Sequence, residues 1–125
     1  MNKDFNYVYD LCLELLEFIQ SEQDLWINRE GKRAFESLEK IKVSLLSISQ
    51  ELNQTPIDYR NLNTLCIATD KILGNEITNA FIFPPKISES AKQFVIRNRE
   101  TSLETWKNIK TIISDLVRAS IFSNS

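Results

Sequence analysis

The residues of this chain that could do chemistry are carboxylates, two cysteines and a short basic run, and the chain contains no histidine. Without histidine, Ser-His and Cys-His nucleophile pairs and the usual zinc ligand sets are excluded. Two glycines in 125 residues leave no glycine-rich loop to hold a phosphate. We therefore predict no catalytic, cofactor-binding or metal-binding residue, and a protein that is not an enzyme.

The carboxylates recur at helical spacing, as in Asp10, Glu14 and Glu17. These positions fall away from the apolar side of the helix that carries them, so we interpret them as a solvated surface and not as an acid/base pair. Cys12 and Cys66 fall on apolar helix sides and lack the spacing of a metal or redox site. Buried, reduced thiols in a cytoplasmic protein are the expectation.

The polar run Arg97-Asn98-Arg99-Glu100 is the other candidate for chemistry. Asn98 continues the apolar period of its helix, and a single polar residue at such a position commonly sets the register of a bundle. We expect Arg97 and Arg99 to flank it on exposed sides.

Four helices are expected to position these residues, over about 4–27, 32–52, 56–81 and 88–122 in one domain spanning residues 1–125. Apolar residues recur at i, i+3, i+4 and i+7 in each segment. The first boundary stays open, because a competing interpretation ends the first helix near Gln20 and starts a longer second helix near Glu22. Thr55-Pro56 predicts the start of the third helix, and Ser88 can cap the fourth.

The last helix is the longest, and one stripe runs along it without a change of phase. The stripe consists of Ala91, Phe94, Val95, Asn98, Ser102, Trp106, Ile109, Ile113, Leu116, Val117 and Ser120. In the second helix the inner side is Ala34, Leu38, Ile41, Leu45, Ile48 and Leu52.

Short connections between four amphipathic helices predict an all-α, antiparallel up-down-up-down bundle. Counting residues outward from the turns places Thr69, Asn98 and Ser102 at one level. We expect these three to form a buried polar layer, which either sets the register or has a function.

The last helix is about ten residues longer than the third, which predicts that its final turns extend past the bundle. A soluble monomer rarely leaves such an apolar patch open. We predict self-association through this segment, as a homodimer or a higher oligomer. Its residues are Ile112, Ile113, Leu116, Val117, Ile121 and Phe122.

A second partner site is predicted at the opposite end of the bundle. Trp26 follows one helix, and Phe83, Pro84 and Pro85 form a stiff apolar connection after another. Rigid apolar residues can bind a partner at low entropic cost. This tip either contacts a second protein or closes the end of the bundle.

The favoured function is a non-enzymatic module that binds protein, either another copy of itself or a different protein. An alternative is a nucleic-acid-associated subunit that uses Lys92, Arg97, Arg99, Lys107 and Lys110. Acidic residues on the same helix and a net charge of −2 argue against that alternative. A third hypothesis is an apolar small-molecule carrier with a cavity at the polar layer. No run of residues is long and apolar enough to predict a membrane span.

Overall fold

The computed structural model describes residues 3–26, 32–79 and 88–123, and within these ranges the chain is helical apart from short turns and contains no strand. The four helices are α1 (Lys3–Trp26), α2 (Lys32–Leu52), α3 (Tyr59–Asn79) and α4 (Glu89–Ser123). The all-α prediction is confirmed. None of the described helices is long and apolar enough to cross a membrane.

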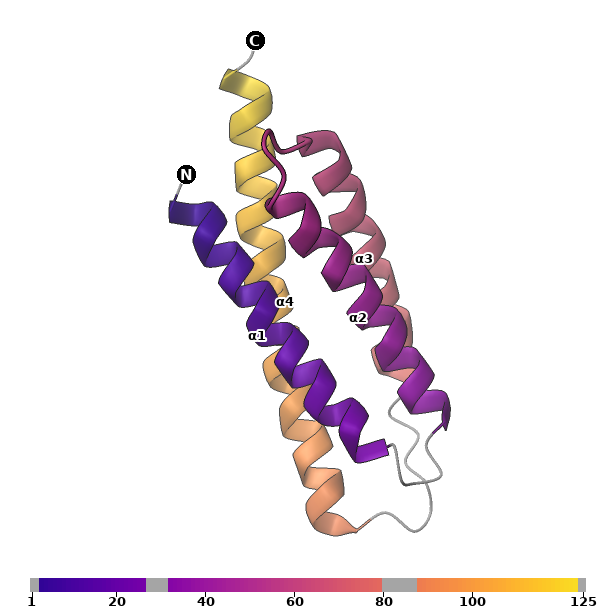
Figure 1. Cartoon of the computed structure of the whole chain (residues 1–125). Helices are drawn as coiled ribbons and strands as arrows, with labels where there is room; N and C mark the ends of the chain where they lie inside the picture. Colours follow the sequence, from indigo (N-terminus) through magenta and orange to yellow (C-terminus); the bar gives the residue numbers. More distant parts are fainter. Residues whose placement is uncertain (1–2, 27–31, 80–87, 124–125) are drawn as a thin grey trace.

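The helices form a bundle in which each packs against the next and α4 packs against α1. Figure 1 shows consecutive helices running in opposite directions, and the last turns of α4 reaching beyond the turn that joins α2 and α3. Both features agree with the sequence analysis.

The structure resolves the open boundary of the first helix. α1 continues without a break to Trp26, so the interpretation that ended it near Gln20 is wrong. Gln23 explains part of the extension: its side chain is buried, and its Nε2 donates to Glu39 Oε2 of α2 at 2.6 Å. The last turns of α1 are therefore held against α2.

The start of the third helix was predicted three residues too early. α3 begins at Tyr59 and not at Pro56, because Asp58 is the residue that caps it. Oδ1 of Asp58 accepts hydrogen bonds from the backbone N–H of Arg60 and of Asn61, both at 3.1 Å, as an N-cap residue does. At α4 the expected cap is present, since Ser88 Oγ accepts from the backbone N–H of Ala91 at 3.2 Å.

The core is a single cluster of aliphatic side chains, cysteines and one tryptophan to which all four helices contribute. Its members are Val8, Cys12, Leu15, Ile19, Leu38, Ile41, Leu45, Ile48, Leu52, Leu62, Cys66, Leu73, Val95, Trp106, Ile109, Ile113, Leu116 and Val117. One predicted member of the stripe is misplaced: Phe94 is 42% exposed. It lies about 100° around the helix from Val95, at the edge of the stripe, where the core does not reach it.

Leu45 and Leu46 provide a matched test of which side of α2 faces the core. Leu45 is fully buried, whereas Leu46 is 42% exposed. We expect Leu45→Ala to lower the free energy of unfolding by about 2–5 kcal/mol, because it removes buried methyl groups and leaves a cavity. Leu46→Ala should cost under about 1 kcal/mol. Urea unfolding followed by circular dichroism measures both, and equal losses would contradict the assignment.

Candidate interaction surface

The apolar tail of α4, predicted to mediate self-association, is largely covered by its own chain. Ile113 is fully buried, and Leu116 and Val117 are 9% and 6% exposed. Ile112 is partly buried against the same core. For Ile113, Leu116 and Val117 the expectation of an open patch is therefore wrong, because this part of α4 packs on its own bundle. The predicted self-association itself stays a prediction. The side chains of Ile121 and Phe122 lie outside the described residues.

The predicted tip at the other end also lies outside what the structure describes. Trp26 is the last residue of α1, but its side chain is not among the described ones. Phe83, Pro84 and Pro85 fall in the gap between α3 and α4. The tip therefore stays a prediction.

The residues of the predicted polar layer are bonded to different neighbours. Thr69 is fully buried, and its hydroxyl lies 2.5 Å from Ser44 Oγ of α2. Asn98 is half-buried, and its Nδ2 donates to the carbonyl oxygen of Phe18 in α1 at 2.8 Å. Ser102 is buried and donates to the Asn98 carbonyl at 2.7 Å. The Ser44–Thr69 contact joins α2 to α3 and the Asn98–Phe18 hydrogen bond joins α4 to α1, whereas the Ser102 hydrogen bond lies within α4.

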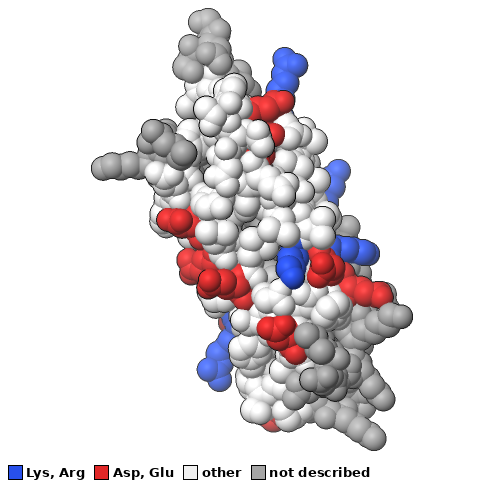
Figure 2. Space-filling view, viewed as in Figure 1, with Lys and Arg blue, Asp and Glu red and all other residues white. Residues whose placement is uncertain are grey.

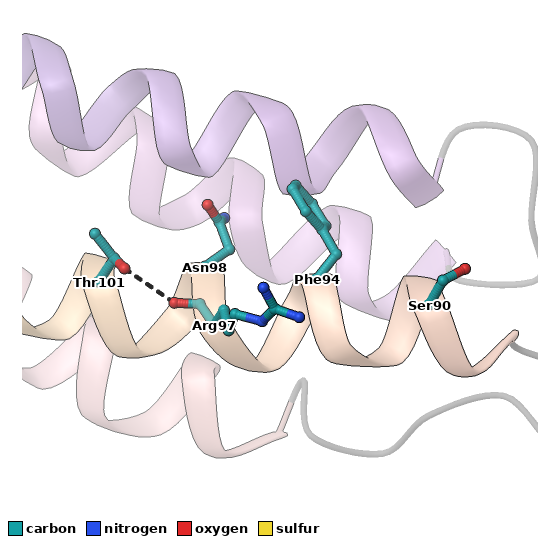
Figure 3. Close-up of a pocket in the computed structure, with 5 residues that line it drawn as sticks. All are labelled: Ser90, Phe94, Arg97, Asn98 and Thr101. Atoms are coloured by element: carbon teal, nitrogen blue, oxygen red, sulfur yellow. Dashed lines mark hydrogen bonds between the residues drawn. The ribbon is translucent and has the colours of Figure 1, made fainter.

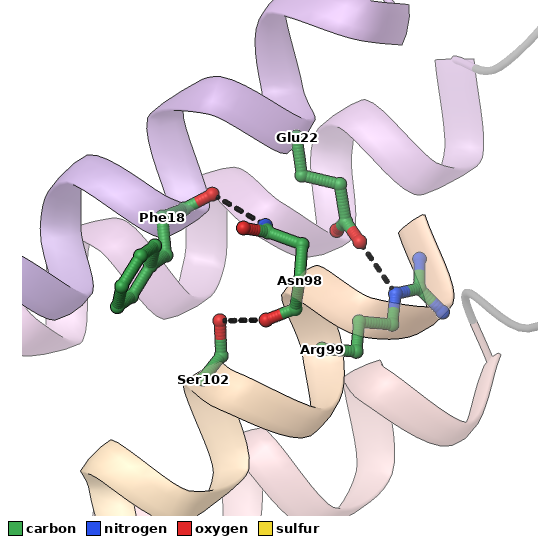
Figure 4. Close-up of polar contacts among 5 residues, drawn as sticks. All are labelled: Phe18, Glu22, Asn98, Arg99 and Ser102. Carbon is green, nitrogen blue, oxygen red and sulfur yellow. Dashed lines mark hydrogen bonds and ion pairs between the residues drawn. The ribbon is translucent and has the colours of Figure 1, made fainter. Parts of the chain in front are cut away.

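The main departure from the sequence analysis is a buried ion pair between the first and last helices. Arg99 was expected on an exposed side, but it is 2% exposed, and its Nε donates to Glu22 Oε1 at 2.7 Å. Figure 4 shows the two side chains meeting between α1 and α4, beside the Asn98–Phe18 hydrogen bond. Among the described residues, Oε2 of Glu22 has no hydrogen-bond partner. Burial raises the pKa of Glu22 above its ordinary value of 4.5, and the hydrogen bond and charge of Arg99 oppose that rise.

A sequence signal for this pair exists, but it is weak. Glu22 follows Ile19 by three residues and Leu15 by seven, and Arg99 follows Val95 by four. Both charged residues therefore occupy positions of the apolar period. Periodicity alone does not pair them. In each helix taken by itself, a charged residue within the apolar stripe could equally lie at the edge of that stripe, exposed to solvent.

The burial of Arg99 removes one residue from the proposed nucleic-acid surface. A second, Lys110, lies 3.3 Å from Asp70 Oδ1 of α3, which also accepts from the indole N–H of Trp106 at 2.9 Å. The Trp106 hydrogen bond and then Lys110 lower the pKa of Asp70. Arg97 and Lys107 are exposed, and the exposed Glu100 and Glu104 lie on the same outer side of the helix.

The hollow nearest this region has few groups left to bind a ligand. It has a volume of about 290 Å³ and is lined by Ser90, Phe94, Arg97, Asn98 and Thr101. Figure 3 shows these five side chains along one side of α4. The Thr101 hydroxyl already donates to the Arg97 carbonyl at 3.0 Å, and the Asn98 amide already donates to Phe18.

Both cysteines are buried, as predicted. Burial raises the pKa of Cys12 to about 12, although a hydrogen bond with Ser49 opposes the change. The pKa of Cys66 is raised to about 11, also mainly by burial, with Asp70 adding to the rise. Both thiols are therefore protonated at neutral pH and have little nucleophilic character.

The surface that stands out is formed by two uncharged segments of α2 and α3. Residues 43–50 (VSLLSISQ) and residues 61–69 (NLNTLCIAT) contain no Asp, Glu, Lys or Arg. Two contacts align them. Near one end Ser44 meets Thr69, and at the other Asn61 Nδ2 donates to Glu51 Oε1 at 2.5 Å. The antiparallel packing of α2 on α3 therefore places the two segments side by side over their whole length.

We refer to the outward side of this region as the uncharged face. It comprises Val43, Leu46, Ser47 and Gln50 of α2 and Asn61, Leu65 and Ala68 of α3. Val43 is 55% exposed and Leu46 is 42% exposed. Figure 2 shows the outward side of α2, and the area over its second half is largely free of charged side chains.

Two hollows of about 520 Å³ each lie on or beside the uncharged face. The first is lined by Ser47, Gln50 and Leu65 among others, and its lining includes the carboxylates of Glu51 and Asp58. The second is lined by Val43, Ser44 and Ile72 together with the charged residues Glu36, Glu39 and Lys40. The sequence analysis missed this surface. The sequence feature that could have indicated this surface is the absence of charged residues from both segments. That feature indicates a surface only when the two segments are known to be neighbours.

Comparisons with known proteins add no constraint on function, since no family model, curated protein or solved structure matches the chain.

The buried ion pair predicts a pH-dependent defect in Arg99→Met. Without Arg99, burial raises the pKa of folded Glu22 further, while unfolded Glu22 still ionises near 4.5. The unfolded state then holds fewer protons than the folded state as the pH rises above that value, so stability falls with increasing pH. We expect a small deficit relative to wild type near pH 4 and about 3–5 kcal/mol at neutral pH. Urea unfolding at both pH values measures the deficit.

The control for this experiment is the double variant Glu22→Leu/Arg99→Met. It has no ionisable group at the site, so its deficit should be smaller at neutral pH and should not widen with pH. A deficit for Arg99→Met that is equal at the two pH values would show that Glu22 does not carry the effect.

The raised pKa values predict that neither thiol reacts in the folded protein. At pH 8 we expect labelling with a thiol-reactive disulfide reagent to be slower than in urea by at least about 100-fold, because both thiols are protonated and covered. Absorbance of the released thiol measures the rate. Rapid labelling of Cys12 in the native protein would contradict the burial described above.

Proposed function

We propose that this chain is a non-enzymatic protein-interaction module and that it binds its partner through the uncharged face. The observation that carries the proposal is that two large apolar side chains, Val43 and Leu46, are exposed on the charge-free second half of α2. Leu38, Ile41 and Leu45 face the core, while Val43 and Leu46 are exposed on the outside. Apolar side chains that lie together on a charge-free stretch of surface are typical of a site that another protein covers.

The composition of the face supports the same proposal. Interaction surfaces on soluble proteins are depleted in charge at their centre and have a polar rim. Here the centre is uncharged, and the side chains that border it include Lys40 and Asp58 at opposite ends, both exposed. Burying the exposed parts of Val43 and Leu46 gains about 25 cal/mol per Å² of apolar area.

The proposal predicts cross-linking at one position and not at another. With a photo-crosslinking phenylalanine analogue in place of Val43, we expect covalent adducts to protein in cells that express the chain. The matched control is Ile67, which is 52% exposed but lies about 200° around α3 from Leu65, away from the face. Mass spectrometry identifies the adducts. Equal yields at both positions, or no adduct at position 43, would overturn the proposal.

A further inference from the structure

We propose that the partner of this chain is a basic, amphipathic protein segment. Its apolar side covers the exposed apolar side chains between α1 and α2, and its lysine or arginine side chains lie on the carboxylates of α1. This inference rests on the proposed function, because it specifies the chemistry of the partner that Val43 and Leu46 contact. The surface extends from these two residues across α2 onto α1.

Two contacts between side chains align α1 with α2. Gln23 Nε2 donates to Glu39 Oε2 at 2.6 Å, and Lys42 Nζ donates to Gln20 Oε1 at 2.5 Å. Three residues back along α1 therefore correspond to three residues forward along α2. These four residues also identify the side of each helix that faces the other.

Large apolar side chains continue both of these facing sides towards the other end of the bundle. Leu46 follows Glu39 by seven residues, and Leu13 precedes Gln20 by seven, so each lies two turns further along the same side of its helix. Four residues beyond the second contact, Leu16 is level with Leu46 and is partly buried against the core. Leu13 is 41% exposed and Leu46 is 42% exposed. We refer to Leu13, Leu16, Val43 and Leu46 as the apolar seam.

A row of carboxylates follows the apolar seam along α1. Asp10 lies three residues before Leu13 and Glu17 lies four residues after it, so both are its neighbours on the helix surface. Glu14 continues the row, and all three carboxylates are exposed. In the part of the chain that the structure describes, none of them forms an ion pair. The single basic residue of α1 is Lys3, at its start.

Charge complementarity specifies the partner. Figure 2 shows acidic side chains gathered over α1, beside the area of α2 that is largely free of charge. On the other side of the seam, the hollow next to Val43 is lined by Glu36 and Glu39 but by one basic residue, Lys40. Carboxylates three or four residues apart on a helix repel each other. A partner with lysine or arginine at its border relieves this repulsion, whereas an acidic partner adds to it.

The arrangement fits a helix laid along the groove between α1 and α2. An amphipathic helix docks through apolar side chains on one side, and its flanking residues then reach the borders of the groove. Here Leu13 and Leu46 offer the apolar contact, and the acidic row forms one border. Nucleic acids and anionic membranes carry phosphate groups, which the acidic row repels, so the occupant is a protein segment.

The test uses a model partner, a synthetic helical peptide of about 18 residues with leucine along one side and lysine on both flanks. Fluorescence anisotropy of the labelled peptide measures its binding to the purified chain. We expect a dissociation constant below about 100 μM at low salt. Binding should be at least about tenfold weaker in about 0.5 M NaCl, because salt screens exposed charges. The same peptide with glutamate in place of lysine should not bind.

Two double variants separate the acidic row from the net charge of the chain. Glu14→Gln/Glu17→Gln should weaken binding of the lysine peptide by at least about tenfold, because it removes two carboxylates of the row. Glu100→Gln/Glu104→Gln changes the net charge by the same amount on the outer side of α4, and it should leave the affinity unchanged.

A second pair of variants tests the apolar seam. Leu13→Gln should weaken binding at least about fivefold, because it removes an apolar contact on α1. Ile67→Gln, which alters an exposed apolar residue of α3, should have no effect. Circular dichroism checks that each variant is folded.

The outcomes separate this inference from the proposed function. A basic partner is ruled out if the lysine peptide does not bind at about 1 mM, or if it binds no better than its glutamate version. Equal affinity for the two double variants overturns the role of the acidic row. If position 43 nevertheless cross-links to a protein in cells, the interaction module stands with a partner of different chemistry. If position 43 yields no adduct, the proposed function falls as well.

Discussion

The buried ion pair between Glu22 and Arg99 constrains how the first and last helices can pack. The two residues are 77 positions apart in the chain, and each side chain is almost completely withdrawn from water. Removing two charges from water is costly, and close contact with good geometry recovers only part of that cost. A shift of α4 by one residue would separate the charges and leave each of them buried. The pair therefore restricts the register of α1 on α4 more tightly than aliphatic contacts alone could.

The α2–α3 half of the bundle obtains its register in a different way. Hydroxyl and amide groups make the specific contacts there, between Ser44 and Thr69 and between Asn61 and Glu51. The outward side of residues 43–50 and 61–69 is without charge because neither segment contains a charged residue. The same contacts that align α2 with α3 thus also align the uncharged segments that form the uncharged face. The packing of α2 on α3 and the position of the uncharged face therefore depend on the same contacts.

The alternatives considered from the sequence lose support for physical reasons. The nucleic-acid surface depended on basic side chains gathered on one side of α4. Arg99 is instead used inside the core, and Lys110 is held near Asp70. The tail of α4 was thought to lack a cover, but Ile113, Leu116 and Val117 are already packed within their own chain. Arg99 in the first case, and these three apolar residues in the second, were counted as surface but are buried; Lys110 keeps 43% of its side chain exposed.

The sequence by itself determined the fold class, the extents of the helices to within a few residues, and most of the core. Helical periodicity carries that information locally, and Leu38, Ile41, Leu45 and Ile48 are buried as the period predicts. The N-cap of α3 was harder to predict, because Thr55-Pro56 and Asp58 are both possible helix starts and lie within four residues of each other.

Only the tertiary structure decided which polar and uncharged residues meet. The pairing of Glu22 with Arg99, the covering of the α4 tail and the alignment of residues 43–50 with residues 61–69 all depend on helices brought together across turns. Periodicity assigns a residue to a side of its own helix. It cannot assign the residue that lies opposite, because that depends on the relative shift of two helices, and the shift is set by side-chain contacts between them.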